Sequence, residues 1–410
     1  MLSKSFAEIS VQDLQNFVAE HPPENDQLEF KETLPAPKGL KSDPWLLGEN
    51  RIGDRARNEV LEEIVAFANA HGGTLLLGIS QSEEKPHRAE KICPIPKCHD
   101  LAERLRHQCR DCIEPQILMI EIVGLETDKD GAGVVLMRVP RSGLAPHRHT
   151  ITKECYHRRA DRSEKMTMRE IQDLVLQAER GQEAINKKFE ARRKGFRETF
   201  SGWLHVNVQA FAAHVCLVPL DSIFLEEVHR SSVLDGIRRK FSAKSGHHPF
   251  EMPFPFTPIN RRPLLRGTTK FEKDDDRYIG ATAWSDGTIE FRLTLKAREE
   301  HGNLMYPGWF MGMAANGLIA AEAFRQTCGA VATPYGMEAA IQVFGEPLKI
   351  LSYSGSGHWD VAGELGVGAT EFPRYGVADK ASFQDVLATF ERDFWHATGR
   401  DWDDRLEVMI

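Results

Sequence analysis

The feature that most constrains the fold of this chain is a helix-forming segment followed at once by a short apolar run. Between residues 58 and 70, apolar side chains recur with the 3.6-residue period of an amphipathic helix, and Gly72 and Gly73 then end it. Residues 74–80 follow as an almost uninterrupted apolar run, which is typical of a strand buried on both faces. A helix that leads into such a strand predicts an α/β or α+β unit.

Other elements extend this unit to about 180 residues. Residues 27–33 alternate apolar and charged side chains, which is the pattern of a half-buried strand. Patterns further along the chain predict a helix at 99–111, strands at 116–123, 133–139 and 154–159, and a helix that Thr167 caps. We therefore expect a mixed α+β fold.

A chain of 410 residues is too long for one ordinary domain, and the sequence predicts a second one. We expect an N-terminal domain at residues 1–180, a charged helical connector with little apolar face at 181–200, and a second α+β domain at 201–410. In that second domain the patterns predict a hairpin at 279–296 and helices at 309–327 and 382–397.

Composition excludes several classes of protein. No stretch approaches the ~20 apolar residues that a membrane-spanning helix needs. Residues 1–19 lack the basic start and apolar block of a signal peptide and predict a short polar helix, capped at Ser10. Seven cysteines in a long chain without an export signal favour a reducing cytoplasm over a disulfide scaffold. We therefore expect a cytoplasmic protein without a membrane partner.

The net charge of −8 gives no general attraction to nucleic acid, yet one segment is strongly basic. Residues 138–169 contain nine Lys and Arg against three Asp and Glu. Arginine suits phosphate contacts because its planar guanidinium forms two parallel hydrogen bonds. The alternative is that these charges only solvate an exposed face. The candidates for nucleic-acid contact are Arg148, Lys153, Arg158, Arg159 and Arg162.

The sharpest chemical motif is a pair of glutamates five residues apart at the predicted first strand. Glu24 in a turn and Glu29 on the strand can converge and share a divalent cation, Mg²⁺ or Mn²⁺, which would position a phosphodiester and activate a water molecule. Lys31 projects from the same strand face as Glu29 and could hold a phosphate. The alternative is that these side chains merely solvate the edge of a strand.

The order of these motifs resembles the Schlafen AlbA-type domain. The first motif is Glu24-x4-Glu29-Phe-Lys31, the second is Val65-Ala-Phe-Ala-Asn69, and the third is Gly72-Gly-Thr-Leu-Leu-Leu-Gly-Ile79. A later stretch, from Cys155-Tyr-His-Arg-Arg159 through Arg162 to Met168-Arg-Glu-Ile171, also resembles the aromatic–arginine strand and helix start of that family. The resemblance covers residues 20–178, and nothing beyond residue 180 extends it.

The resemblance implies a nucleic-acid-binding fold and, in some members, a metal-dependent endoribonuclease that acts on tRNA or rRNA through three carboxylates. Glu24 and Glu29 match the first two positions. Gln81 stands where the family has the third acid, so either Glu83 substitutes for it or the site is impaired. Some relatives are described as ATP-binding, but residues 48–54 lack the lysine and the hydroxyl of a phosphate-binding loop, so we do not expect ATP.

Four cysteines lead to a separate prediction. Their spacings would allow thiolates, with His99, to bind a structural zinc ion; these are Cys93, Cys98, Cys109 and Cys112. The alternative is that the last two, near the end of a helix, pack in the core as small apolar side chains.

Two hypotheses about function follow. The first is a Schlafen-like, metal-dependent endoribonuclease on structured RNA such as tRNA, an effector of defence or toxin type that residues 201–410 control as a regulatory or sensing domain. The second is a non-catalytic nucleic-acid-binding regulator with a degenerate acidic site. Because the chain holds one copy of a domain that vertebrate relatives use in pairs, we also expect a homodimer. The catalytic candidates are Glu24, Glu29, Lys31, Gln81 and Glu83.

Overall fold

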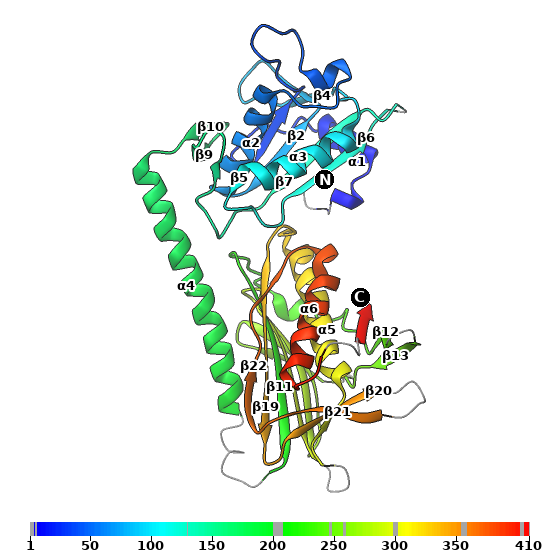
Figure 1. Cartoon of the computed structure of the whole chain (residues 1–410). Coiled ribbons are helices and arrows are strands. Elements are labelled where there is room, and N and C mark those ends of the chain that lie inside the picture. The colour runs from blue at the N-terminus through cyan, green and yellow to red at the C-terminus, as the bar shows by residue number, and fades with distance from the viewer. Residues whose placement is uncertain are drawn as a thin grey trace. The chain divides into compact units, whose positions relative to one another are not determined.

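The computed structural model describes residue 4 and residues 6–128, 130–199, 208–245, 248–256, 260–297, 302–353, 359–401 and 406–409. The chain divides into two compact units, Met1–Gln182 and Glu183–Ile410. Both combine helices with β-sheets (Figure 1), which confirms the α+β class predicted from the sequence.

The centre of the first unit is a mixed four-stranded sheet. In spatial order its strands are β1 (Leu28–Lys31), β2 (Gly73–Leu77), β7 (Gly133–Val139) and β6 (Glu121–Glu126). Only β1 and β2 are parallel, and the other neighbours are antiparallel. The apolar run that predicted a buried strand forms β2, where Leu75, Leu76 and Leu77 have no exposed surface.

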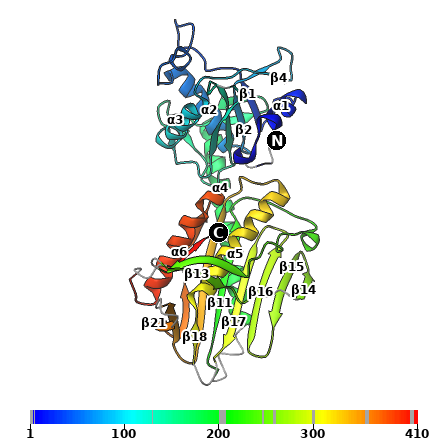
Figure 2. The same ribbon diagram turned by 90° about the vertical axis from the view of Figure 1, so that its right-hand side faces the viewer.

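Helices cover both faces of this sheet (Figure 2). Because neighbouring residues of a strand point to opposite faces, Leu75 and Leu77 meet one helical layer and Leu76 meets the other. The first layer consists of α2 (Asp54–Ala68) and α3 (Cys98–Cys112), and the second contains α1 (Val11–Ala19). The capping box expected at Ser10 is present at the start of α1.

Short elements complete the first unit. They are the 3-10 helices η1 (Phe6–Glu8) and η2 (Pro44–Leu47), the strand pair β3 (Ile79–Gln81) and β4 (Ala89–Ile92), the strand pair β5 (Ile113–Glu114) and β8 (Arg148–His149), and the hairpin of β9 (Tyr156–Arg159) and β10 (Arg162–Lys165). The hairpin lies against α2. It therefore brings the basic segment next to the helix that precedes the central strand.

The second unit is built on a large antiparallel sheet. Its strands in spatial order are β14 (Asn260–Leu264), β15 (Gly267–Lys273), β16 (Arg277–Trp284), β17 (Ile289–Lys296), β11 (Ala210–Pro219), β19 (Tyr335–Phe344) and β22 (Gly368–Glu371), and β23 (Tyr375–Val377) also pairs with β19. Two small sheets join β13 (His248–Pro253), β12 (Lys240–Ser245) and β24 (Leu406–Met409), and β18 (Leu304–Met305), β20 (Leu348–Tyr353) and β21 (Trp359–Leu365). Two 3-10 helices, η4 (Val228–Arg230) and η5 (Lys380–Ser382), lie between these elements in the chain.

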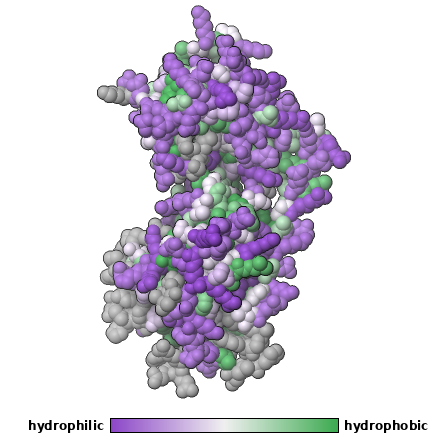
Figure 3. All heavy atoms as spheres, turned by 180° about the vertical axis from the view of Figure 1, so that it is seen from behind, coloured by the Kyte–Doolittle hydropathy of each residue, from purple (hydrophilic) through white to green (hydrophobic). Residues whose placement is uncertain are grey.

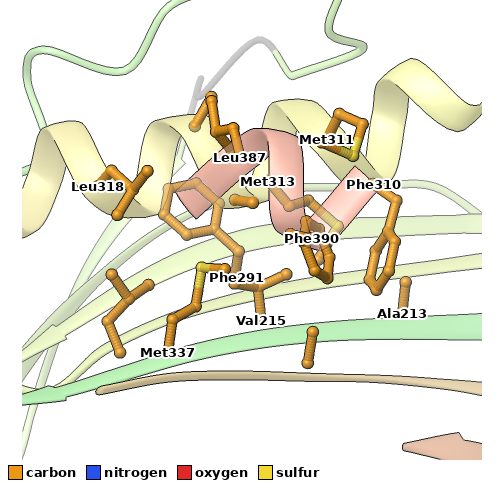
Figure 4. Close-up of a cluster of buried hydrophobic side chains, with 14 of the residues drawn as sticks. Ala213, Val215, Phe291, Phe310, Met311, Met313, Leu318, Met337, Leu387 and Phe390 are labelled. Carbon is orange, nitrogen blue, oxygen red and sulfur yellow. The ribbon is translucent and has the colours of Figure 1, made fainter. Parts of the chain in front are cut away.

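Two long helices cover one face of the large sheet. They are α5 (Pro307–Cys328) and α6 (Phe383–Ala397). Figure 4 shows Phe310 of α5 and Phe390 of α6 above the strands, and Phe291 rising from the sheet to meet them. The approach is close: a Cβ atom on Gly317 would lie 2.5 Å from the side chain of Leu217. A glycine at this position therefore lets α5 pack directly on β11.

One helix, α4 (Met168–Thr199), begins in the first unit and ends in the second. Of the connector predicted at 181–200, residues 181–199 are part of this helix, and residue 200 lies outside the described residues. The small apolar face of the connector was underestimated, because Phe189 and Phe196 are buried against the second face of the large sheet. The second half of α4 is therefore part of the core of the second unit.

The predicted elements of the second unit correspond to β16 and β17, α5 and α6. The strand expected at 116–123 was only partly right: Met119 takes a left-handed backbone conformation, so pairing of β6 begins at Glu121. Within the described ranges, no helix is both long and apolar enough to cross a membrane.

Candidate functional site

The two glutamates singled out from the sequence lie together at β1. Glu24 and Glu29 are each only 8% exposed. Glu24 precedes the strand, and its Oε1 accepts a hydrogen bond of 2.9 Å from the backbone N–H of Phe30. Lys31 shares the strand face of Glu29, and its Nζ lies 3.3 Å from Glu29 Oε1. The alternation of the strand thus places Glu29 and Lys31 in one buried site beside Glu24.

A third carboxylate, Glu63 of α2, belongs to the same site and was not predicted. Its Oε1 lies 3.4 Å from Lys31 Nζ, and its Oε2 accepts a hydrogen bond of 2.5 Å from Ser163 Oγ. The sequence pattern holds no signal for it, because Glu63 reads as one of the polar residues of α2 until the hairpin packs on that helix. We call Glu24, Glu29 and Glu63 the acidic cluster.

Arg158 of β9 holds two members of the acidic cluster. Its Nη2 lies 2.6 Å from Glu29 Oε2, and its Nη1 lies 2.8 Å from Glu63 Oε2. The Arg158 side chain has no exposed surface. It was expected to contact nucleic acid, but buried carboxylates need a nearby cation, and here Arg158 supplies it from inside the protein.

The pKa values of two members of the acidic cluster, Glu24 and Glu29, are raised. Burial raises the pKa of Glu24 to about 7, and the charge of Glu29 adds to this effect. Burial and the charge of Glu63 also raise the pKa of Glu29. Burial opposes the charged form of Lys31, but Glu63 and Glu29 more than offset it, so the pKa of Lys31 is raised. Three carboxylates facing two cations leave this site short of positive charge.

Gln81 reaches the acidic cluster from β3. With its side-chain nitrogen turned toward Glu24, it donates to Oε1 at 2.6 Å and to Oε2 at 3.2 Å. An amide here supplies hydrogen bonds, whereas an aspartate would add a repelling charge. Glu83 lies beyond the end of β3 with an exposed side chain. The third carboxylate that joins Glu24 and Glu29 in this site is therefore Glu63, rather than Glu83.

Asn69, which follows α2, fixes the segment that carries Arg158. Its Nδ2 donates to the carbonyl oxygens of His147 at 2.8 Å and Tyr156 at 2.9 Å. Its Oδ1 accepts from the backbone N–H of His147 at 2.7 Å. This buried amide ties the start of β9 to the end of α2. Arg158 lies two residues further along, so Asn69 is a positioning residue for the site.

The other cations expected to contact nucleic acid are exposed on and beside β8 to β10; they are Arg148, Lys153, Arg159 and Arg162. Three of them pair with nearby acids: Arg148 with Glu114, Arg159 with Glu164 and Glu170, and Arg162 with Asp161. Exposed ion pairs contribute little to stability, so these cations can exchange an acid for a phosphate at small cost. Figure 3 shows a largely hydrophilic surface over the first unit.

The four cysteines considered as zinc ligands do not come together. Cys98 begins α3, whereas Cys109 and Cys112 lie at its other end. At 1.5 Å per residue, the helix separates Cys98 from Cys109 by about 16 Å. Cys98 and Cys109 pack in the core, and burial raises the pKa of Cys109 to about 12, which disfavours the thiolate. These residues therefore do not form the site that their spacing suggested.

A different group of potential metal ligands lies in the second unit. His214 and Cys216 of β11 and Glu290 of β17 are buried, and their ligand atoms lie within 4.8 Å of one another. This geometry could hold a metal ion. However, Arg292 Nη2 lies 2.9 Å and Arg192 Nη1 lies 3.7 Å from the carboxylate oxygens of Glu290. Two guanidinium groups beside the only carboxylate of the group oppose the entry of a further cation.

Comparison with known families identifies a similarity over much of the first unit. Residues 24–167 match the family model described as Schlafen, AlbA_2. The match lies within the first unit and agrees with the resemblance that its motifs carry, and similarity to a Schlafen AlbA-type domain indicates a nucleic-acid-related function. The match ends before the second unit begins.

Comparison with individual proteins finds only a distant structural similarity. No curated protein matches the chain. Among solved structures, the N-terminal domain of a putative ATP-dependent DNA helicase RecG-related protein from Nitrosomonas europaea is similar, with 17% sequence identity and a TM-score of 0.25. That similarity covers 39% of this chain and 94% of the other.

Proposed function

We propose that the first unit is an endoribonuclease domain that binds structured RNA, such as tRNA, and cleaves it at the acidic cluster. The observation that carries this proposal is the convergence of Glu24 and Glu29, from the segment that forms β1, with Glu63 of α2 in one buried site. Burying ionised carboxylates costs free energy, and clusters with perturbed pKa values are typical of functional sites. The hairpin of β9 and β10 that carries Arg158 into this site also carries the exposed Arg159 and Arg162.

A divalent cation such as Mg²⁺ or Mn²⁺, which the resemblance implies, does not fit the acidic cluster as its side chains stand. Both oxygens of Glu29 and both of Glu63 are paired with Lys31 or Arg158. Glu24 is occupied by the N–H of Phe30 and by Gln81. A metal ion would first need one of the two cations to leave.

The residues of the chain itself can bind and orient a phosphodiester. Lys31 is the cation of the site that retains exposed surface, so it can meet a phosphate, whereas Arg158 cannot. Arg159 and Arg162 would hold the sugar–phosphate backbone beside it. Such contacts read the shape of an RNA helix rather than its sequence.

The test is cleavage of total tRNA in the presence of Mn²⁺. We expect wild-type protein and the exposed control Glu83→Gln to cleave, and Glu29→Gln and Glu63→Gln to be slower by at least about 100-fold. Equal cleavage by all four proteins, or by none, would contradict the proposal. Cleavage lost only in Glu83→Gln would place the third carboxylate there instead.

A second candidate function is nucleic-acid binding without cleavage. It is favoured by the neutralisation of Glu29 and Glu63 by internal cations and by the amide of Gln81 in place of an acid. In that case wild-type protein retards tRNA in a gel-shift assay and leaves it intact, and Glu63→Gln behaves in the same way.

We also propose that residues 201–410 regulate the first unit or sense a trigger, in a defence or toxin-type effector. The support is that α4 belongs to both units, so the second unit holds one end of a helix that starts beside the hairpin. Truncation after Gln182 tests this better than truncation after residue 200, which would expose Phe189 and Phe196. A regulator predicts greater toxicity on expression, whereas unchanged cleavage without toxicity argues against it.

The expected homodimer remains a proposal as well. Exposed apolar side chains on the first half of α4, including Met168, Val175 and Leu176, could form its contact. Light scattering that gives a constant mass near the 46.3 kDa of one chain, with and without RNA, would exclude it.

A further inference from the structure

We propose that Lys31 is a resident cation that closes the acidic cluster in the free protein, and that the phosphates of a bound RNA open it to a divalent cation by drawing Lys31 away. The inference rests on the proposed function, because it assumes that RNA reaches this site. It concerns the order in which RNA and metal bind.

The starting observation is a closed ring of ion pairs. Lys31 Nζ bridges Glu29 Oε1 at 3.3 Å and Glu63 Oε1 at 3.4 Å. Arg158 bridges the other oxygens of the same two carboxylates, at 2.6 Å and 2.8 Å. Mg²⁺ binds oxygens at about 2.0–2.1 Å and needs ligand atoms that face it. The ammonium of Lys31 therefore lies between the two carboxylates that would have to hold a metal ion.

The two cations are not equally fixed. The Arg158 side chain is fully buried, also donates to the carbonyl oxygen of Asn25 at 3.2 Å, and lies over the ring of Phe67. The Lys31 side chain is 20% exposed, and its two contacts are longer than those of Arg158. A lysine also has a flexible stem and a single charged group. Lys31 is therefore the member of the ring that can leave while the fold stays intact.

Departure of Lys31 would leave an uncompensated charge. Glu29 and Glu63 would then share only Arg158, and Glu29 is close enough to Glu24 for its charge to act on that carboxyl. Excess negative charge in a buried place favours the entry of a divalent cation. Because RNA and metal would each disfavour the closed ring, each should raise the affinity of the protein for the other by the same factor.

The experiment is titration of Mn²⁺ followed by the electron paramagnetic resonance signal of the free ion, with the full-length chain. The RNA probe is a 2′-O-methylated hairpin, which lacks the free 2′-hydroxyl and so reduces the chance that cleavage disturbs the titration. In wild-type protein we expect the hairpin to tighten Mn²⁺ binding at least about 10-fold. Lys31→Met should bind Mn²⁺ with that higher affinity without the hairpin, and the hairpin should add little.

Lys91→Met, an exposed lysine on β4, serves as the matched control and should behave as wild type. The inference is overturned if Lys31→Met binds Mn²⁺ no more tightly than wild type, or if the hairpin has no effect on wild type. The effect of the hairpin on Mn²⁺ binding by wild-type protein tests the inference even if Lys31→Met does not fold. Neither readout is cleavage: coupling without tRNA cleavage would reject the proposed function alone, and cleavage without coupling would reject this inference alone.

Discussion

Two buried polar groups, the acidic cluster of the first unit and the group around Glu290 in the second, differ in their balance of charge. In the acidic cluster, Glu24, Glu29 and Glu63 face two cations, and the pKa values of Glu24 and Glu29 are raised. In the second unit, a single carboxylate, Glu290, is surrounded by donors. Although burial opposes its ionisation, a hydrogen bond from His214 and the charges of Arg292 and Arg192 hold the pKa of Glu290 well below its usual range.

The difference shows how burial alone fails to mark a functional site. The Glu290 group is complete, since Trp284 Nε1 also donates to its carboxylate at 2.7 Å. It helps to hold the second half of α4, through Arg192, on the large sheet. The acidic cluster still lacks one positive charge and can therefore accept a cation or a proton.

The largest expected effect comes from removing the internal cation of the acidic cluster. Arg158→Met leaves Glu29 and Glu63 buried with only Lys31, and we expect the first unit to lose about 3–5 kcal/mol of stability. Differential scanning calorimetry of the full chain measures this as a lowered transition of that unit. Arg159→Met, which removes an exposed neighbour, should change it by less than about 0.5 kcal/mol. If adding Glu63→Gln does not recover part of the loss, repulsion between carboxylates is not the cause.

A substitution of Glu290 in the second unit tests whether the charges of that buried group are balanced. Glu290→Gln removes the negative charge beside Arg292 and Arg192 and turns one of the two acceptor oxygens into a donor, and we expect a loss of about 2–3 kcal/mol in the second transition. Zn²⁺ should leave the wild-type transition where it is, because the guanidinium groups repel it. A rise with Zn²⁺ that Cys216→Ser abolishes would show that the group binds metal after all.

A smaller effect depends on pH. The pKa of Glu24 is about 7 in the folded protein, against 4.5 for an ordinary glutamate, so the folded state holds the extra proton between these values. Stability must then fall as pH rises through that window. We expect Glu24→Gln, which mimics the protonated form, to gain about 1–3 kcal/mol relative to wild type between pH 5 and pH 8. Chemical denaturation at both pH values, with Glu83→Gln as control, measures it; a constant difference contradicts the raised pKa.

The smallest expected effect concerns the exposed cations. Arg162→Ala should weaken RNA binding only modestly, and lower the slope of log affinity against log salt by about one, because one phosphate contact is lost. Fluorescence anisotropy at several salt concentrations gives the slope. A slope that does not change would mean that Arg162 keeps its contact with Asp161 and does not meet the RNA.

Local patterns in the sequence were sufficient for part of the site. Glu29 and Lys31 share a face because strand residues alternate, and the order of motifs around them led to the Schlafen AlbA-type domain. The resemblance, rather than spacing, gave the interpretation that Gln81 stands where the family has an acid. The prediction for Glu29 and Lys31 rests on neighbours in the chain, where spacing and geometry are closely linked.

The rest depends on contacts that spacing cannot reveal. Glu63 belongs to the polar side of α2 by its pattern, and only the packing of the hairpin on that helix makes it part of the site. Arg158 pairs with Glu29 across 129 positions of sequence. A basic segment predicts phosphate contacts for all its arginines, yet this one is turned inward by the carboxylates beneath it. Phe189 and Phe196 were overlooked because two aromatic residues form a narrow stripe in a highly charged helix.

The hydrogen bonds of Asn69 to the segment that carries Arg158 have a consequence for how the domain folds while it is being synthesised. Arg158 follows Glu63 by 95 positions, so at ~5–20 residues per second it leaves the ribosome roughly 5–20 s later. During that interval Glu29 and Glu63 have no guanidinium beside them, and the amide of Asn69 lacks the carbonyls of His147 and Tyr156. Water must satisfy these carboxylates and this amide until the hairpin of β9 and β10 has been synthesised. Docking of the last segment of the domain and burial of its acidic cluster are then a single event, so a nascent chain cannot enclose the site before the domain is complete.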